Sequence, residues 1–153
     1  MVVVVIIGLM ASFLVVNLGQ DLDRLARLES QRFTVVVNEI RDEAIIAGEA
    51  FIMVVDKKSR TYSFRSVRKN RSIAQDDGLF KVRSVKKGLE LDWDVFEQFE
   101  QDRDDDSDPQ VFISPLGEIT PFDVRFGGEK LDYHVFINEE NQLERRSEKS
   151  NSL

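Results

Sequence analysis

Four aspartates at alternate positions of an acidic stretch are the first candidates for chemistry in this chain. Their spacing resembles that of the first ligands of a calcium-binding loop: Asp102, Asp104, Asp106 and Asp108. An EF-hand loop needs a glycine where this chain has Ser107, and no glutamate closes the loop at the required distance. We therefore predict no metal here, and interpret residues 97–108, which are too charged to bury, as a mobile solvated loop.

Residue types that support catalysis are otherwise sparse. The chain has no cysteine, which excludes disulfides and cysteine-based sites, and His134 is its only histidine, which excludes histidine-pair metal motifs. No serine stands in a Gly-x-Ser-x-Gly motif, and Gly127 and Gly128 lack the spacing of a phosphate loop. We predict that the chain is not an enzyme, that it binds no cofactor, and that His134 has a structural role.

Charge is segregated along the chain. The net charge of −7 argues against a protein built to bind nucleic acid. Basic residues nevertheless crowd the middle of the sequence: Lys57, Lys58, Arg60, Arg65, Arg68, Lys69, Arg71, Lys81, Arg83, Lys86 and Lys87. In residues 90–108 every charged side chain except Arg103 is acidic, so the two groups are either solvated faces or complementary docking surfaces. DNA binding is an alternative function, and its contacts would be basic residues near two aromatic ones: Arg65, Arg68, Lys69 and Arg71.

The elements that position these groups begin with an apolar N-terminal run. Residues 1–18 contain no charged side chain and no proline, and Asp21 is the first ionisable residue. As a helix this run covers about 27 Å, close to the ~30 Å hydrocarbon core of a bilayer. Its valines and isoleucines favour a strand in water, but a lone strand in lipid leaves its amides unpaired. We therefore predict a transmembrane anchor helix over residues 1–20.

A cleavable signal peptide is the alternative for this run. It needs a basic residue ahead of the apolar core, and no lysine or arginine precedes Asp21. One flank of the predicted helix carries small residues, against which a second helix can pack closely: Gly8, Ala11 and Ser12.

From Asp21 the apolar run changes to an amphipathic pattern. Apolar residues recur at spacings typical of one helix face: Leu22, Leu25, Ala26, Phe33, Val36, Ile40, Ala44 and Ala47. No proline interrupts residues 1–55, so we predict one continuous helix, with an amphipathic part over residues 21–48 that ends near Gly48. Oppositely charged side chains at helical spacing predict weak surface ion pairs: Asp21 with Arg24, Asp23 with Arg27, and Glu29 with Arg32.

From residue 49 the pattern has a period of two, which predicts a β domain over residues 49–146 and a frayed tail over residues 147–153. The first two strands, 50–55 and 61–67, are expected as a hairpin. Two more strand candidates, 79–85 and 89–96, are joined at residues 86–88, and the sequence leaves their pairing open. The last strands are expected as a meander: 110–114, 118–126, 130–137 and 142–146. Pro121 predicts an edge strand or a bulge. The fold class is therefore α+β, a long helix packed on a small antiparallel β domain.

This order of elements resembles the pilin and pseudopilin architecture. The run VVVVIIGLMASFL resembles the continuation of the type IV prepilin N-terminal signature. The helix resembles that of the type II secretion system protein H family, whose Arg-Asp-Glu-Ala motif is matched by Arg41, Asp42, Glu43 and Ala44. A late hairpin of the same family, with a Pro-x-Gly turn and a Thr-Pro-Phe strand, is matched by Pro115, Gly117, Thr120, Pro121 and Phe122.

The resemblance implies a minor pseudopilin, a structural subunit of the periplasmic pseudopilus in protein secretion. Its single span would lie in the inner membrane and its β domain in the periplasm, and its partners would be other major and minor pseudopilins and the inner-membrane assembly platform. The chain also resembles FimT-type minor type IV pilins, which implies pilus assembly or DNA uptake instead. The peptidase segment of such proteins, with its methylated phenylalanine, is missing before Met1, so we expect a longer natural precursor.

Overall fold

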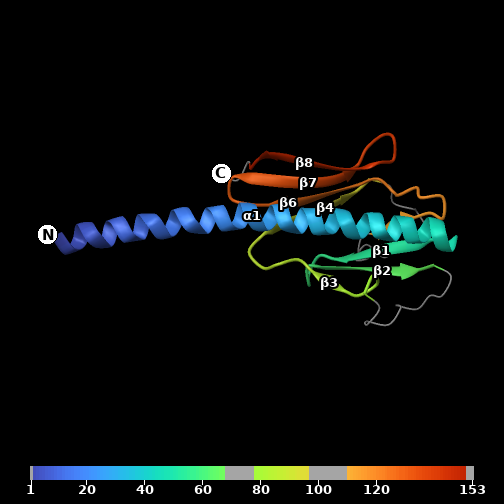
Figure 1. The fold of residues 1–153 in the computed structure, drawn as a ribbon, viewed down its shortest axis with the longest axis horizontal. Coiled ribbons are helices and arrows are strands. Elements are labelled where there is room, and N and C mark those ends of the chain that lie inside the picture. The colour runs from blue at the N-terminus through green and yellow to red at the C-terminus, as the bar shows by residue number, and fades with distance from the viewer. Residues whose placement is uncertain (1, 68–77, 97–109, 151–153) are drawn as a thin grey trace.

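A single helix runs the length of the molecule (Figure 1). The computed structural model describes the backbone of residues 2–67, 78–96 and 110–150, and the side chains of these ranges from residue 22 onward. Helix α1 spans Val2–Ala47 without a break, as the lack of proline predicts. Its first half projects clear of the domain, and its second half lies along the β-sheets (Figure 1).

The helix ends where the sequence predicts. Gly48 has a φ of 62°, in the left-handed region that glycine adopts at low cost. The N–H of Glu49 donates to the carbonyl of Ala44 at 3.2 Å, which closes a Schellman-type cap. The chain therefore leaves the helix in a fixed direction and enters the first strand.

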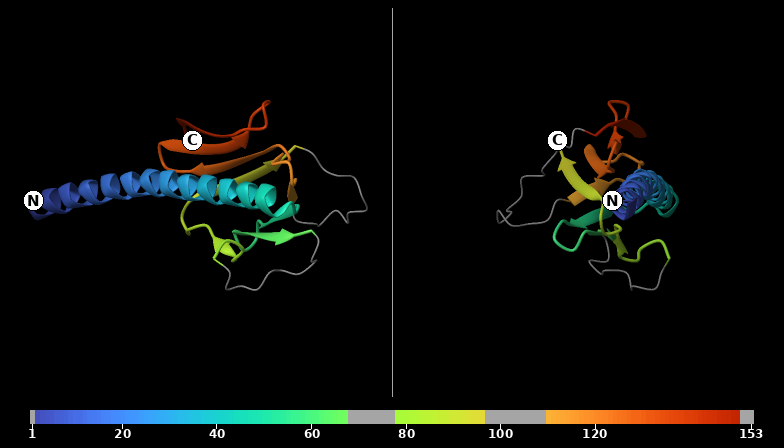
Figure 2. Two further views of the ribbon diagram at one scale, coloured as in Figure 1. Left: turned by 45° about the vertical axis from the view of Figure 1, so that its right-hand side comes forward. Right: turned by 90° about the vertical axis from the view of Figure 1, so that its left-hand side faces the viewer.

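The described residues form eight strands in two four-stranded antiparallel sheets. The first sheet has the order β3-β2-β1-β5, with β1 Phe51–Asp56, β2 Thr61–Ser66, β3 Arg83–Ser84 and β5 Gln110–Ile113. The second sheet has the order β4-β6-β7-β8, with β4 Glu90–Val95, β6 Phe122–Gly127, β7 Leu131–Ile137 and β8 Leu143–Lys149. Figures 1 and 2 show the helix lying across the junction of the two sheets. The predicted α+β fold class is confirmed.

Phe33, in the middle of the packed half of α1, joins the two sheets. Its fully buried ring lies 5.2 Å from Tyr62 of the first sheet, and 5.4 and 5.8 Å from Trp93 and Phe126 of the second sheet. The interplanar angles with Tyr62 and Trp93 are 80° and 77°, so both pairs have the favourable edge-to-face geometry. The side chain of Phe33 thus joins the helix to both sheets in one core.

The predicted helical stripe faces this core. Its buried members are Ala26, Phe33, Val36, Ile40 and Ala44, and Leu22 and Leu25 are partly buried beside them. The stripe is wrong at two positions, because Ala47 is exposed and Val37 is fully buried. Ala47 lies in the last turn, where the helix passes the edge of the sheets.

The two strand candidates in the middle of the chain, β3 and β4, belong to different sheets. The segment before β3 folds into turns around Arg83, whose buried guanidinium donates to the carbonyls of Gly78, Leu79 and Lys81 at 2.7, 2.7 and 3.0 Å. This leaves a strand of two residues, and the chain then crosses to the second sheet. The alternating pattern predicted which residues extend but not which strand they join.

The terminal meander is correct only from β6 onward. Strand β5 pairs with β1 in the first sheet, and β6 lies inside the second sheet, so Pro121 does not mark an edge strand. Pro121 instead precedes β6, where the chain crosses between the sheets, and its missing N–H therefore removes no ladder hydrogen bond. Strand β8 extends to Lys149, beyond the predicted start of the tail, because residues 147–149 pair with the beginning of β7.

The side chain of Asp23 joins the helix to a turn rather than acting only on the helix surface. Its Oδ1 accepts hydrogen bonds from the backbone N–H groups of Glu129, Lys130 and Leu131 at 2.9, 2.9 and 3.2 Å. The predicted pair of Glu29 and Arg32 is present at 3.8 Å. Asp21 lies outside the residues whose side chains are described.

The β domain has two ends along the helix axis. The proximal end is the one from which residues 2–21 project, and it includes the β6–β7 turn and Gly88, which lies beside Leu22. The distal end is the one where α1 stops, and it includes Ile45, the turn at residues 115–117 and the β7–β8 turn.

Candidate functional site

The family-motif residues that are far apart in the sequence meet at the distal end. Gly117 has a φ of 83° and lies directly against the helix: a Cβ at this position would be 2.8 Å from Cδ1 of Ile45 and 3.3 Å from Nε of Arg41. Ala44, one turn from Arg41, is fully buried in the core. Only glycine permits both this backbone conformation and this close approach of the turn to the helix.

Ser114 holds this turn in shape. Its Oγ accepts hydrogen bonds from the N–H groups of Leu116 and Glu118 at 3.2 and 3.1 Å, and its carbonyl accepts one from Gly117 at 2.9 Å. Pro115 suits the turn because its ring fixes φ. Leu116 stands at the tip with 82% of its surface exposed, and Ile46 of the adjacent helix end is 81% exposed. The distal end therefore presents apolar side chains to the solvent.

The Thr-Pro-Phe segment carries the chain from the first sheet to the second. Thr120 donates its N–H to the carbonyl of Phe112 at 2.9 Å and accepts the N–H of Phe112 on Oγ1 at 3.2 Å. The carbonyl of Pro121 accepts the N–H of Phe96 at 3.0 Å, and Phe122 is fully buried against Phe33. Thr120, Pro121 and Phe122 thus have packing or hydrogen-bonding reasons for their types.

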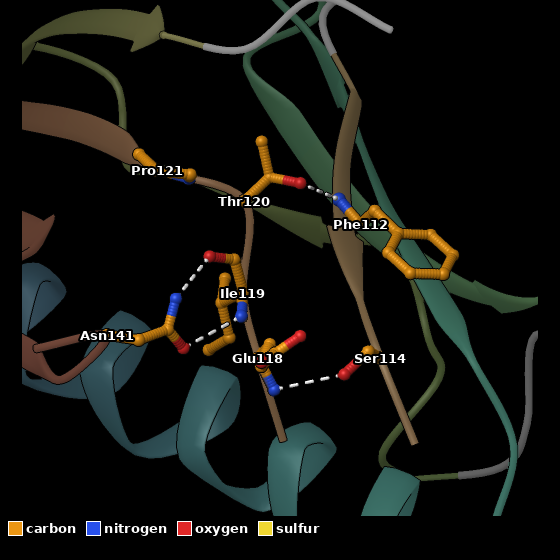
Figure 3. A pocket seen from close by; sticks show the side chains of 7 residues that line it. All are labelled: Phe112, Ser114, Glu118, Ile119, Thr120, Pro121 and Asn141. Carbon is orange, nitrogen blue, oxygen red and sulfur yellow. Dashed lines mark hydrogen bonds between the residues drawn. The ribbon is translucent and has the colours of Figure 1, made fainter. Parts of the chain in front are cut away.

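A shallow pocket of about 360 Å³ lies beside this crossover (Figure 3). It is lined by Phe112, Ser114, Glu118, Ile119, Thr120, Pro121 and Asn141. Asn141, in the left-handed conformation with a φ of 58°, closes one side: its amide donates to the carbonyl of Ile119 at 2.8 Å and accepts the N–H of Ile119 at 3.0 Å. Sequence reasoning missed the roles of Ser114 and Asn141, although both lie in predicted turns, where such side chains bind backbone.

The chemistry of this pocket suits binding rather than catalysis. Glu118 is the one titratable residue among those that line it, and its carboxylate is exposed. His134, which we considered for catalysis, lies in the second sheet with Nδ1 3.0 Å from Oδ1 of Asp123. This pair spans neighbouring strands β6 and β7, so it contributes to the sheet surface, as a structural role for His134 predicts.

A second charged group on this sheet is centred on Arg125. Its guanidinium lies 3.2 Å from Asp132 and 3.3 Å from Glu90, and so bridges β4 and β7 across β6. Burial alone would lower the pKa of Arg125, but the hydrogen bond and charge of Asp132 and the charge of Glu90 outweigh it and raise the pKa. Arg125 is therefore a permanent cation that ties three strands together.

Several cations of the basic stretch are engaged with the protein's own backbone. Lys57 donates to the carbonyl of Trp93 at 3.1 Å, Arg60 donates to the carbonyl of Leu89, and Arg83 binds three carbonyls. Burial lowers the pKa of Arg83, although its side chain keeps hydrogen-bond acceptors around it. The contacts of Lys57 and Arg60 link the first hairpin to β4 and to the residue before it, and all three cations use donors that could otherwise bind phosphate.

The other predicted site residues fall mainly outside the described part of the chain. Arg65, in β2, is half-buried and pairs with Ile52, and the remaining suggested DNA contacts lie outside: Arg68, Lys69 and Arg71. The side chains of the suggested helix-packing flank are also outside: Gly8, Ala11 and Ser12. The acidic loop of residues 97–108 lies outside as well.

The predicted membrane span likewise falls on residues whose side chains are not described. Within the part of the chain that the structure does describe, α1 is not apolar enough over a sufficient length to cross a membrane.

The fold has counterparts among solved structures. The minor pseudopilin EpsH from the type 2 secretion system of Vibrio cholerae superposes with a TM-score of 0.64 at 23% sequence identity, and the match covers 80% of this chain and 96% of EpsH. A second crystal structure of EpsH matches with the same TM-score and coverage at 22% identity. The chain therefore has the fold of this minor pseudopilin, as the resemblance to protein H predicts. No protein-family model and no curated protein match the sequence.

Proposed function

We propose that this chain is a minor pseudopilin, a structural subunit of the periplasmic pseudopilus of a type II secretion system. In this role residues 1–20 anchor it in the inner membrane, and the β domain lies in the periplasm. Its partners are other major and minor pseudopilins and the inner-membrane assembly platform. Its contribution to secretion is assembly rather than catalysis.

The observation that carries the proposal is the division of one unbroken helix into two halves. Residues 22–47 pack on a domain with the fold of EpsH, whereas the helix of the preceding residues extends beyond that domain (Figure 1). The projecting part is uncharged in sequence up to Asp21, so it needs an apolar environment. Lipid and the equivalent helices of neighbouring subunits provide that environment, first in the membrane and then in a filament.

Gly8 offers the sharpest test of this proposal. Leucine at this position should prevent close approach of a neighbouring helix and weaken assembly by roughly three- to tenfold. The readout is oxidative disulfide crosslinking between a single cysteine introduced at Asn17 and a single cysteine introduced into a co-expressed pseudopilin. The chain has no cysteine of its own to compete with the introduced one.

Ile6→Leu is the matched control, because it changes an apolar side chain of the same segment on the opposite face of the helix from the small-residue flank. Both variants should keep the thermal unfolding temperature of the β domain, which lies far from residue 8. Equal crosslinking of the Gly8→Leu variant and the parent would contradict helix packing by this flank. Absence of the parent chain from the membrane fraction would contradict the anchor itself.

A further inference from the structure

The proximal end of the domain is ringed by basic side chains. Six exposed cations come from four separate segments of the chain: Arg24, Arg27, Lys86, Lys87, Lys130 and Lys149. Two belong to the helix, two to the connection that leads into β4, one to the β6–β7 turn and one to the end of β8. This gathering is notable in a chain whose net charge is −7.

Specific contacts hold these segments around the helix. Three backbone N–H groups of the β6–β7 turn donate to Asp23, which fixes Lys130 beside the start of the packed half of α1. Lys149 pairs with Leu131, and the N–H of Ser150 donates to the carbonyl of Lys130 at 2.8 Å. Gly88, next to Lys87, lies within van der Waals reach of Leu22. The ring of cations is therefore set at a defined level of the helix.

Acidic residues at this end are fewer. Among the described side chains two exposed acidic residues have cationic partners: Glu90 lies 3.3 Å from Arg125 and Glu148 lies 2.8 Å from Arg146. The others are Asp23, whose Oδ1 accepts the N–H groups of the turn, and the exposed Glu129, while Asp21 precedes them in the sequence. The distal end has the opposite character, with an exposed acidic group: Asp42, Glu118, Glu139 and Glu140. Charge is thus polarised along the helix axis, with the positive end toward the projecting helix.

We propose that the proximal ring docks on the anionic lipid headgroups of the membrane that the projecting helix enters. The inference rests on the proposed membrane anchor and adds to it a second, electrostatic contact made by the β domain. The β6–β7 turn, the connection into β4 and the end of β8 all lie at the end of the domain from which the helix projects (Figures 1 and 2), so a flat membrane surface that the helix enters would face them together. A DNA duplex laid on the same end would have to avoid the projecting helix.

The geometry suits a weak and reversible contact. Each lysine or arginine near an anionic membrane favours binding by about fivefold, and the effect vanishes beyond a Debye length of roughly 8–10 Å. Such a contact would hold the domain upright against the membrane before assembly. It would break when the subunit leaves the lipid for the filament.

The experiment uses the full chain reconstituted into vesicles of phosphatidylcholine, with or without phosphatidylglycerol. A fluorophore on a single cysteine at the exposed Ser84, two residues before Lys86, reports energy transfer to headgroup-labelled lipid. Flotation with the neutral vesicles measures insertion separately. We expect insertion into both vesicle types, with higher energy transfer on the anionic vesicles and loss of that increase at high salt.

Two pairs of charge reversals test the ring itself. Lys86→Glu with Lys87→Glu should reduce docking on anionic vesicles by roughly tenfold or more, and so should Lys130→Glu with Lys149→Glu from the other sheet. Lys81→Glu with Arg145→Glu is the control of equal charge, because these exposed residues lie away from the proximal end. Flotation of every variant on neutral vesicles checks that the anchor is intact.

The outcomes separate the two proposals. Insertion with equal energy transfer on neutral and anionic vesicles, or equal losses in the ring and control variants, would overturn the lipid contact and leave the anchor standing. Failure of the parent chain to float with any vesicle would overturn the anchor, and the lipid contact with it.

Discussion

At the proximal end a carboxylate of α1 binds the backbone of a turn, whereas at the distal end the helix meets the domain through a glycine and apolar side chains. Asp23 accepts three N–H groups of the β6–β7 turn, and Gly117 lets its own turn approach Ile45 and Arg41. The proximal contact depends on hydrogen bonds to the carboxylate of Asp23, and the distal contact depends on close packing of a glycine turn against the helix.

The difference extends to the surfaces of the two ends. The proximal end is basic and surrounds the emerging helix, while the distal end is acidic and exposes Ile46 and Leu116. A charged, hydrogen-bonded end can face headgroups and water, whereas exposed apolar side chains are typical of surfaces that contact another protein. The helix thus separates a basic end, which we propose faces the membrane, from an acidic end that exposes apolar side chains.

The largest effect should come from the residue that lies between the two ends. Phe33→Ala removes a fully buried ring that touches both sheets, so we expect a loss of about 3–5 kcal/mol in the free energy of unfolding. Hydrogen exchange should rise at both ends together, since they share this core. Val35→Ala, at an exposed position on the same helix, should change stability by less than about 0.5 kcal/mol. Protection lost at one end alone would show that the ends are independent.

Asp23→Ala should affect the proximal end selectively. Three N–H groups lose their charged acceptor, and we expect a cost of about 1–3 kcal/mol measured by chemical denaturation. Hydrogen exchange should quicken at residues 129–131 and stay unchanged at residues 117–120. Asp42→Ala is the matched control, an exposed aspartate on the same helix near the distal end. A similar loss in both variants would mean that general helix electrostatics, rather than the turn contact, explains the effect.

The smallest effect should come from the distal cap. Gly48→Ala forces a Cβ into a left-handed backbone conformation, although the space around it is open, so we expect a cost of about 1 kcal/mol. Gly78→Ala, which meets no atom and has no positive φ, is the comparison that isolates backbone strain. Thermal unfolding of the two variants provides the measurement, and equal midpoints would contradict a strained cap.

The features of the two ends differ in how far they can be predicted from the sequence. The distal features were accessible, because Gly48 follows an amphipathic stripe and residues 115–117 carry turn residues. The proximal features could not be predicted in this way. Asp23 has a plausible local partner in Arg27, four residues later on the helix, whereas the turn that it binds lies more than a hundred residues later in the sequence. The basic ring was equally hidden, because its six members are spread from Arg24 to Lys149.

The sequence by itself determined the elements: one proline-free helix that ends at Gly48, and short strands where the apolar period becomes two. These follow from local geometry, since helix and strand periods and the breakers between them act over a few residues. Only the tertiary structure decided that β3 and β4 lie in different sheets, that β5 pairs with β1, and that Asp23 secures a distant turn. The alternation of apolar and polar residues determines which face of the sheet a side chain lies on, but it does not determine which strands pair. Strand pairing therefore depends on how the whole core packs around Phe33.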